Sequence, residues 1–149
     1  MRFEELSRRQ LLLVSLIGAT GSTGFSEPID GSLKLMKEAF LLKMELGDKF
    51  QYNFLPYDFG PCSFEIYEDL NNLIKNGIIN EGKSKTFSVY SVADSYNTIV
   101  AKLMESLEPE VKEKIMKIKN KFNRLTYYAL IAHVYEKYPQ LTKASKFRL

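Results

Sequence analysis

The chain has 149 residues, of which 45% are hydrophobic and 26% are charged. This length suits one domain, and this apolar content is enough for a packed core, which excludes global disorder. The single cysteine, Cys62, excludes an internal disulfide and fits a cytoplasmic protein, and the single histidine, His133, leaves little from which to build a zinc site. We therefore expect no metal and no other cofactor.

The net charge of +3 is unevenly distributed along the chain. Residues 1–110 carry 11 basic and 16 acidic side chains, whereas residues 111–149 carry 10 basic and 2 acidic ones. The front of the chain is thus acidic and the back is basic. This asymmetry predicts either an anionic partner for the last third or electrostatic packing of one part of the chain against the other.

The N-terminal segment resembles an export signal only in part. Ser7–Leu13 imitates a twin-arginine signal, but Glu4 and Glu5 precede it, and the apolar run over 11–17 is far too short to span a bilayer. We interpret the segment as a buried first helix that runs from about Phe3 or Glu5 to Ile17, and we expect no membrane association.

Two further elements are expected before residue 57. Asp30 or Ser32 can cap a second helix, which should end near Leu46 because Gly47 follows. Phe50, Tyr52 and Phe54 then alternate with polar neighbours. Such alternation predicts a half-buried strand over 49–55, which we expect to pair with the hairpin described next.

The most specific pattern lies between residues 57 and 92. Ser63 can cap a helix over 64–76, whose apolar residues recur at helical spacing, and Gly77 can end that helix in a left-handed conformation. Residues 78–79 are apolar and extended in pattern, 81–85 form a charged turn, and 86–92 alternate like the second strand of a hairpin. A helix, a glycine stop and a hairpin in this order are typical of the third helix and wing of a winged-helix domain.

Residues 93–149 are expected to form a helical extension packed on a winged-helix domain of residues 1–92. Asp94 or Ser95 can cap the first extension helix, which carries Ile99, Leu103 and Leu107. Pro109 starts the second helix and Thr126 caps the last. The second helix has a heptad seam made of Val111, Ile115, Ile118, Phe122 and Leu125. Two heptads favour an antiparallel pair of helices within the chain, and a homodimer through these helices is the alternative.

Three blocks of the sequence resemble a known group of proteins. They are Pro28–Gly31 leading into 35–42, the central block from Phe54 to Ile79, and 134–139 followed by Ser145. The group consists of small, largely uncharacterised bacterial and archaeal winged-helix proteins, and it is more distantly similar to the Panacea antitoxin domain of phage-associated proteins. The resemblance covers nearly the whole chain. It implies an α+β winged-helix fold and a regulatory or antitoxin-like role, and it supplies no catalytic residues.

The function that we favour from the sequence is a transcriptional regulator that binds duplex DNA. A helix in the groove can read bases while wing lysines hold phosphates, but the helix over 64–76 is acidic in its first half. The lysine-rich helix over 111–124 and the tail residues Lys143, Lys146 and Arg148 are therefore a further DNA surface, or else a solvated face. The candidate DNA-binding residues are Lys83, Lys85, Lys114, Lys117, Lys119, Lys121, Arg124, Asn71 and Asn72.

The alternative function is a protein-interaction module of the antitoxin type. Tyr57 and Phe59 lie beside Pro56 and Gly60 and are candidates for exposed contacts with a partner protein. Glu65, Glu68 and Asp69 form the acidic part of the same candidate surface. No nucleophile, base and orienting group occur together in a recognisable pattern, so we expect no enzyme.

Overall fold

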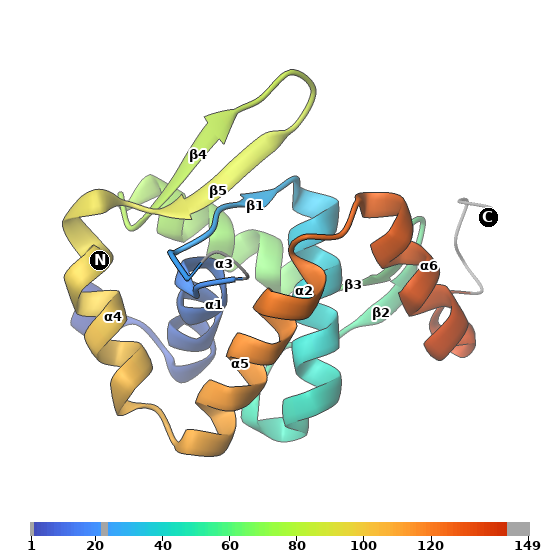
Figure 1. Ribbon diagram of the computed structural model, residues 1–149, viewed down its shortest axis with the longest axis horizontal. Helices are drawn as coiled ribbons and strands as arrows, with labels where there is room; N and C mark the ends of the chain where they lie inside the picture. The colour runs from blue at the N-terminus through green and yellow to red at the C-terminus, as the bar shows by residue number, and fades with distance from the viewer. Residues whose placement is uncertain (1, 22–23, 143–149) are drawn as a thin grey trace.

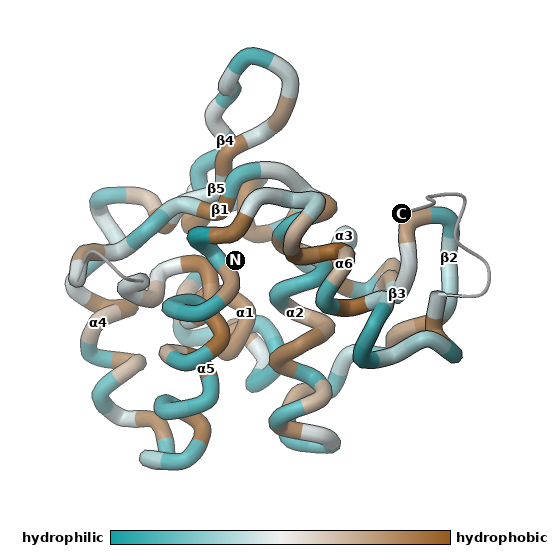
Figure 2. The backbone as a smooth tube through the Cα atoms, turned by 45° about the vertical axis from the view of Figure 1, so that its right-hand side comes forward, coloured by the Kyte–Doolittle hydropathy of each residue, from teal (hydrophilic) through white to brown (hydrophobic). Residues whose placement is uncertain are grey.

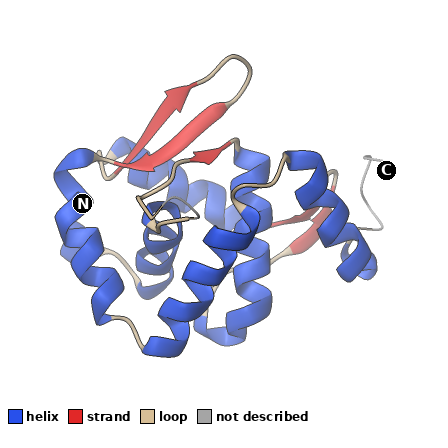
Figure 3. Cartoon of the chain, viewed as in Figure 1, coloured by secondary structure: helices blue, strands red, loops and turns tan. Residues whose placement is uncertain are grey.

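The computed structural model describes residues 2–21 and 24–142 (Figure 1). The tail residues Lys143, Ser145, Lys146 and Arg148 lie outside this part of the chain. The described residues form six α-helices, a three-stranded antiparallel sheet and a separate two-stranded hairpin, which confirms the predicted α+β class (Figure 3). The helices are α1 Arg8–Gly18, α2 Ser32–Leu46, α3 Phe64–Lys75, α4 Asn97–Ser106, α5 Pro109–Phe122 and α6 Tyr127–Lys137. The strands are β1 Ile29–Asp30, β2 Leu55–Tyr57, β3 Gly60–Cys62, β4 Ile79–Lys83 and β5 Ser88–Val92.

Helix α1 starts later than the sequence predicted. Phe3–Glu5 forms a separate 3-10 turn, and the Ser7 side chain caps α1 by accepting a hydrogen bond from the backbone N–H of Gln10 at 3.4 Å. All six residues from Leu12 to Ile17 are buried. A helix that is buried on all sides lies inside the molecule, and α1 indeed packs against α4, α5 and β5.

Helix α2 is the central element, and α5, α6, β1 and β3 all pack on it. Residues 34–42 of α2 are buried without interruption, and three of them are charged, namely Lys34, Lys37 and Glu38. Neither Asp30 nor Ser32 caps this helix, because Asp30 belongs to β1 and the N-cap position is Gly31 with φ of +96°. Only glycine adopts such a backbone conformation readily, so the chain turns there from strand to helix.

The predicted helix and hairpin over 63–92 are confirmed. Ser63 caps α3, Gly77 has φ of +74° after its end, and β4 pairs antiparallel with β5. The first strand is longer than expected, because Glu81–Lys83 belong to β4. The second strand, β5, begins at Ser88 rather than at residue 86, and the connection is 84–87. Strand β1 was not predicted. It adds a third strand to the sheet by pairing with β5, Ile29 with Tyr90 and Asp30 with Val89. Two residues are too short for a recognisable alternating pattern.

The prediction of a strand over 49–55 that pairs with the β4–β5 hairpin was wrong. Phe50 and Tyr52 are fully buried, as their alternation suggested, but residues 50–54 pair with no strand, and only Leu55 belongs to one. Side chains bind its backbone instead: Lys43 Nζ donates to the Phe50 carbonyl at 2.9 Å, and the N–H of Asn53 donates to Glu65 Oε1 at 2.7 Å. The next residues form β2, which pairs with β3 in a hairpin separate from the main sheet.

The C-terminal helices share one hydrophobic core with the rest of the chain. Helix α4 packs on α1, whereas α5 and α6 pack on α2. Of the apolar residues predicted for α4, Leu107 is buried and Leu103 packs on the core, whereas Ile99 is 37% exposed and Val100 is buried in its place. The seam residues Val111, Ile115, Ile118 and Phe122 are all buried within the chain, so a homodimer would need another surface. Figure 2 shows the alternation of hydrophobic and hydrophilic stretches along α5.

None of the helices in the described part of the chain has the length and apolarity needed to cross a bilayer.

Candidate functional site

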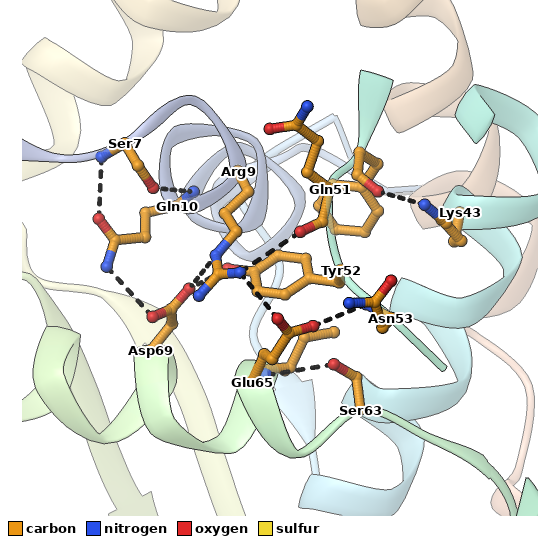
Figure 4. A network of polar contacts seen from close by, with 12 residues as sticks. Ser7, Arg9, Gln10, Lys43, Gln51, Tyr52, Asn53, Ser63, Glu65 and Asp69 are labelled. Atoms are coloured by element: carbon orange, nitrogen blue, oxygen red, sulfur yellow. Dashed lines mark hydrogen bonds and ion pairs between the residues drawn. The ribbon is translucent and has the colours of Figure 1, made fainter. Parts of the chain in front are cut away.

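An interior network joins the first half of α3 to α1 (Figure 4). Asp69 is 4% exposed, and its Oδ2 accepts hydrogen bonds from Arg9 Nε at 3.0 Å and from the Tyr52 hydroxyl at 2.7 Å. The Arg9 guanidinium also lies over the Tyr52 ring, 4.8 Å from its centroid. Burial, and then the hydrogen bond to Asp69, raises the pKa of Tyr52, so its hydroxyl stays protonated and donates.

Glu65 belongs to the same network. Its Oε2 accepts a hydrogen bond from Arg9 Nη1 at 3.1 Å, while Gln10 Nε2 donates to Asp69 Oδ1 at 3.3 Å. Glu65 and Asp69 were predicted to bind a partner protein. The structure contradicts this for Asp69, which is buried, whereas the Glu65 side chain remains 36% exposed beside its ion pair with Arg9. Glu68 is the most exposed of the three predicted acidic residues.

The solvent-facing stripe of α3 is therefore small and almost neutral. It contains Phe64, Glu68, Asn71 and Lys75, which follow each other at helical spacing and are all exposed. The predicted DNA-binding residue Asn71 is in this stripe, whereas Asn72 is half-buried beside it. One acidic and one basic group give this face little attraction for phosphates.

The lysines of α5 are mostly engaged within the molecule. Lys119, predicted to bind DNA, is fully buried, and its Nζ donates to the carbonyl oxygens of Leu16 at 2.9 Å and Ile17 at 2.7 Å. Burial lowers the pKa of Lys119 to about 8. Its physical role is to satisfy carbonyls at the end of α1, so the prediction that Lys119 contacts DNA was wrong.

Two further α5 lysines form ion pairs with α2. Lys114 lies 3.2 Å and Lys117 lies 2.6 Å from the carboxylate oxygens of Glu45. Hydrogen bonding to Lys117 lowers the pKa of Glu45, so the carboxylate remains charged at neutral pH. Lys121, by contrast, is exposed and lies over the Phe122 ring. The basic last third of the chain is thus partly neutralised by the acidic front.

The remaining predicted cations meet at one groove of about 1120 Å³. It lies between the tip of the β4–β5 hairpin, which projects from the body in Figure 1, and the turn that joins α5 to α6. Lys83 and Lys85 line it from the hairpin, and Arg124 lines it from the turn. All three are exposed. Aromatic side chains line it as well, namely Phe87, Tyr127 and Tyr128.

The floor of this groove is the start of α2. Asp30 is the one exposed carboxylate among its lining residues, while the buried Lys34 donates to the backbone oxygen of Asn123. Burial raises the pKa of Tyr127 to about 12, so its hydroxyl is neutral. The described walls of the groove therefore carry an excess of positive charge, which is suited to a phosphate-bearing ligand.

The β2–β3 hairpin carries a second exposed surface. Leu55, Tyr57, Phe59 and Phe64 are each between 42% and 58% exposed, and the Tyr57 and Phe64 rings make an edge contact with centroids 5.1 Å apart. The structure thus places the two predicted partner-binding aromatics, Tyr57 and Phe59, on the surface. Exposed aromatic side chains that lie together are typical of a protein-binding surface.

Helix α2 carries three buried charged residues that were not predicted, namely Lys34, Lys37 and Glu38. Glu38 is fully buried, and neither carboxylate oxygen has a hydrogen-bond partner. Burial raises its pKa to about 8 against the opposing charges of Lys119 and Lys34, so at neutral pH the carboxyl group carries a proton. Lys37 is a third buried charged residue of this helix. The available signal was their position among the core-facing residues of an amphipathic pattern.

The described residues do not assemble a recognisable catalytic or metal centre. No three histidine, cysteine or acidic side chains in the described ranges gather where they could hold a metal ion. His133 packs against Phe122, and burial lowers its pKa, while burial raises the pKa of the Cys62 thiol. A neutral thiol is a poor nucleophile, so the groove lined by Lys83, Lys85 and Arg124 and the surface of the β2–β3 hairpin are the better candidates for function.

Comparison of the chain with models of protein families gave no match, and comparison with curated proteins gave none either.

Proposed function

We propose that this chain is a winged-helix protein that binds nucleic acid. It holds the phosphate backbone in the groove lined by Lys83, Lys85 and Arg124, which we call the wing groove. The fold assignment is supported by the order of the elements, since α1, β1, α2 and α3 are followed by the β4–β5 hairpin, with β1 completing its sheet. In this assignment α3 is the recognition helix and the hairpin is the wing. The protein would then act as a transcriptional regulator.

The observation that carries the proposal is the meeting of Lys83, Lys85 and Arg124 at one groove. These cations come from segments about 40 residues apart in sequence, and none of them forms an ion pair within the described chain. Cations left without an internal carboxylate can neutralise phosphates and release counterions. Phe87 and Tyr128 add exposed rings on which a sugar or an unpaired base can pack.

The near-neutral stripe of α3 sets the kind of binding that we expect. Asn71 is its one side chain that can both donate to and accept from a base edge, so direct readout is limited. Affinity should come mainly from phosphates and should depend steeply on salt. Three phosphate contacts predict that log K falls with log salt with a slope of about −2.7.

The test is fluorescence anisotropy of a labelled mixed-sequence duplex of about two helical turns over a salt series. The double variant Lys83→Glu/Lys85→Glu should bind more weakly and lose roughly 1.8 from the slope. The control, Lys102→Glu/Lys112→Glu, changes the charge equally on α4 and α5 outside the groove and should bind as the wild type does. Absence of binding at low salt, or equal losses in both variants, contradicts the proposal.

A protein-interaction module is the second candidate, favoured by the exposed side chains of Leu55, Tyr57, Phe59 and Phe64. Phe64 lies beside the exposed Glu68, so this surface combines an aromatic anchor with an acidic rim. Such a surface fits an antitoxin-like role in which the partner presents apolar and basic groups. Phe64→Ser tests this surface. If this variant loses the regulatory effect of the protein in cells, and anisotropy shows that the wild type does not bind DNA, the second function replaces the first.

A further inference from the structure

A separate small cavity of about 130 Å³ lies beneath the β2–β3 hairpin. Its walls are mostly apolar and aromatic, formed by Leu33, Met36, Tyr57, Phe59 and Tyr67. Only Leu33 also lines the wing groove, so the two sites are distinct. An apolar cavity of about 150 Å³ can hold a benzene ring, and this cavity therefore suits a ligand of roughly six heavy atoms.

The basic group among the lining residues of the cavity is the amine of Lys37. This side chain is 1% exposed, and its Nζ makes one hydrogen bond, to the carbonyl oxygen of Pro61 at 3.3 Å. An ammonium group has three donors, so most of its hydrogen-bonding capacity is unused. Burial lowers the pKa of Lys37 to about 8, which still leaves the amine largely protonated at neutral pH.

The described residues supply no counter-charge to this ammonium group. Lys37 forms no ion pair with a carboxylate of the described residues. Cys62 lines the cavity too, but burial raises the pKa of its thiol, so the sulfur is neutral at neutral pH. A buried cation without an anion is unfavourable unless a ligand provides one.

The hairpin is shaped around this lysine. Gly60 has φ of +96°, and a Cβ atom at this position would lie 3.3 Å from Lys37 Cε. The absence of a side chain at Gly60 thus allows β3 to close over the lysine stem. The carbonyl of Pro61, the next residue of the same strand, accepts the hydrogen bond from the amine.

We propose that this cavity binds a carboxylate group, with Lys37 as its counterion and the aromatic walls around a short apolar tail. A single ammonium group matches the single charge of a carboxylate, whereas a phosphate dianion needs more donors than the walls supply. The ligand is therefore a small apolar carboxylic acid or the C-terminal carboxylate of a peptide. This inference is independent of nucleic-acid binding.

The experiment is a titration of isotope-labelled full-length protein with butyrate, followed by NMR chemical shifts. Butyramide, which has the same shape without the charge, is the ligand control. Lys37→Met should weaken butyrate binding by roughly tenfold to a hundredfold, since charged hydrogen bonds are the strong ones. Lys43→Met is the protein control, because Lys43 lies on the same helix, also donates to a backbone carbonyl, and is outside the cavity.

A second readout separates binding at Lys37 from a merely structural effect. Pairing with a carboxylate should raise the pKa of Lys37, so that butyrate binding above pH 8 takes up a proton, which calorimetry in buffers of different ionisation enthalpy detects. The other titratable groups that line the cavity are Asp58, Cys62, Tyr57 and Tyr67. Proton uptake should be absent in Lys37→Met.

The source of the carboxylate is decided by a matched peptide pair. A short N-acetylated peptide with a free C-terminus is compared with its C-terminal amide. Binding of butyrate alone identifies a small acid as the ligand, and binding of the free peptide but not its amide identifies a peptide C-terminus. Either result supports the carboxylate site. The proposal is overturned if neither ligand shifts residues of the cavity, or if butyrate and butyramide bind equally well.

Discussion

Glu38→Gln should remove a pH dependence that a buried carboxyl group imposes on stability. The Glu38 pKa is about 8 in the folded protein against an ordinary value of 4.5. A group with a raised folded-state pKa stabilises the fold fully below pH 4.5, and this contribution is lost as the pH rises towards 8. At about 1.4 kcal/mol per pH unit the full loss is roughly 5 kcal/mol, of which about 3.5 kcal/mol falls between pH 5 and pH 8.

The assay is urea unfolding of wild type and variant at pH values from 5 to 8. Glutamine resembles the protonated carboxyl group and does not titrate, so the free energy of unfolding of Glu38→Gln should lack this loss and exceed that of the wild type at pH 8. His133, whose pKa burial lowers, shifts stability in the opposite direction, but equally in both proteins. The groups that act on Glu38 are Lys119, Lys34, Glu27 and Asp30.

Glu45→Gln is the matched control for Glu38→Gln. It lies on the same helix, but hydrogen bonding to Lys117 lowers its pKa, so its titration falls below pH 4.5 and adds no slope from pH 5 to 8. The reasoning is refuted if wild type and Glu38→Gln differ in their pH dependence by less than about 1 kcal/mol over this range. It is refuted equally if Glu45→Gln removes the dependence.

Three substitutions probe single contacts by the same unfolding assay. Tyr52→Phe removes the hydroxyl that donates to Asp69 at 2.7 Å and should cost about 1–2 kcal/mol; an unchanged stability would show that Asp69 is satisfied without it. Gly60→Ala forces a side chain into a backbone with φ of +96° and against Lys37, and should cost about 1–3 kcal/mol, whereas a neutral effect would mean that the hairpin shifts freely. Thr126→Ala removes the α6 cap and should cost about 1 kcal/mol, measurable also as lost helical circular dichroism; full helicity would contradict the cap.

The parts of the fold that were predictable from sequence are those that depend on local chemistry. A cap at Ser63, apolar residues at helical spacing and a left-handed glycine at 77 act within a few residues of each other, and α3 with its hairpin followed as expected. Pro109 and Thr126 likewise mark the starts of α5 and α6. Such signals do not depend on distant partners.

The failures depend on contacts between distant segments. Alternation at Phe50 and Tyr52 correctly indicated their burial, but it could not reveal that Lys43 and Glu65 bind the backbone of this segment in place of a neighbouring strand. The acidic pattern of α3 looked like an exposed face, yet Arg9, about 60 residues away, turns Asp69 inward. Hydrogen-bond partners across such separations are not encoded in spacing.

The charge asymmetry of the sequence allowed two explanations, and the ion pairs distinguish them. Lys114 and Lys117 of the basic last third pair with Glu45 of the acidic front. Electrostatic packing of the basic last third against the acidic front is therefore present in the fold.

That packing narrows the search for an anionic partner. Lys119 lies in the interior and two neighbouring lysines of α5 are paired, so this helix offers fewer cations than its sequence suggests. The exposed cations at the hairpin tip and the α5–α6 turn have no ion pair within the described chain, and they face one groove. Cations whose charge is not already compensated within the protein are the ones left to neutralise phosphates. This groove, and not the lysine-rich helix, is therefore the place to test for phosphates.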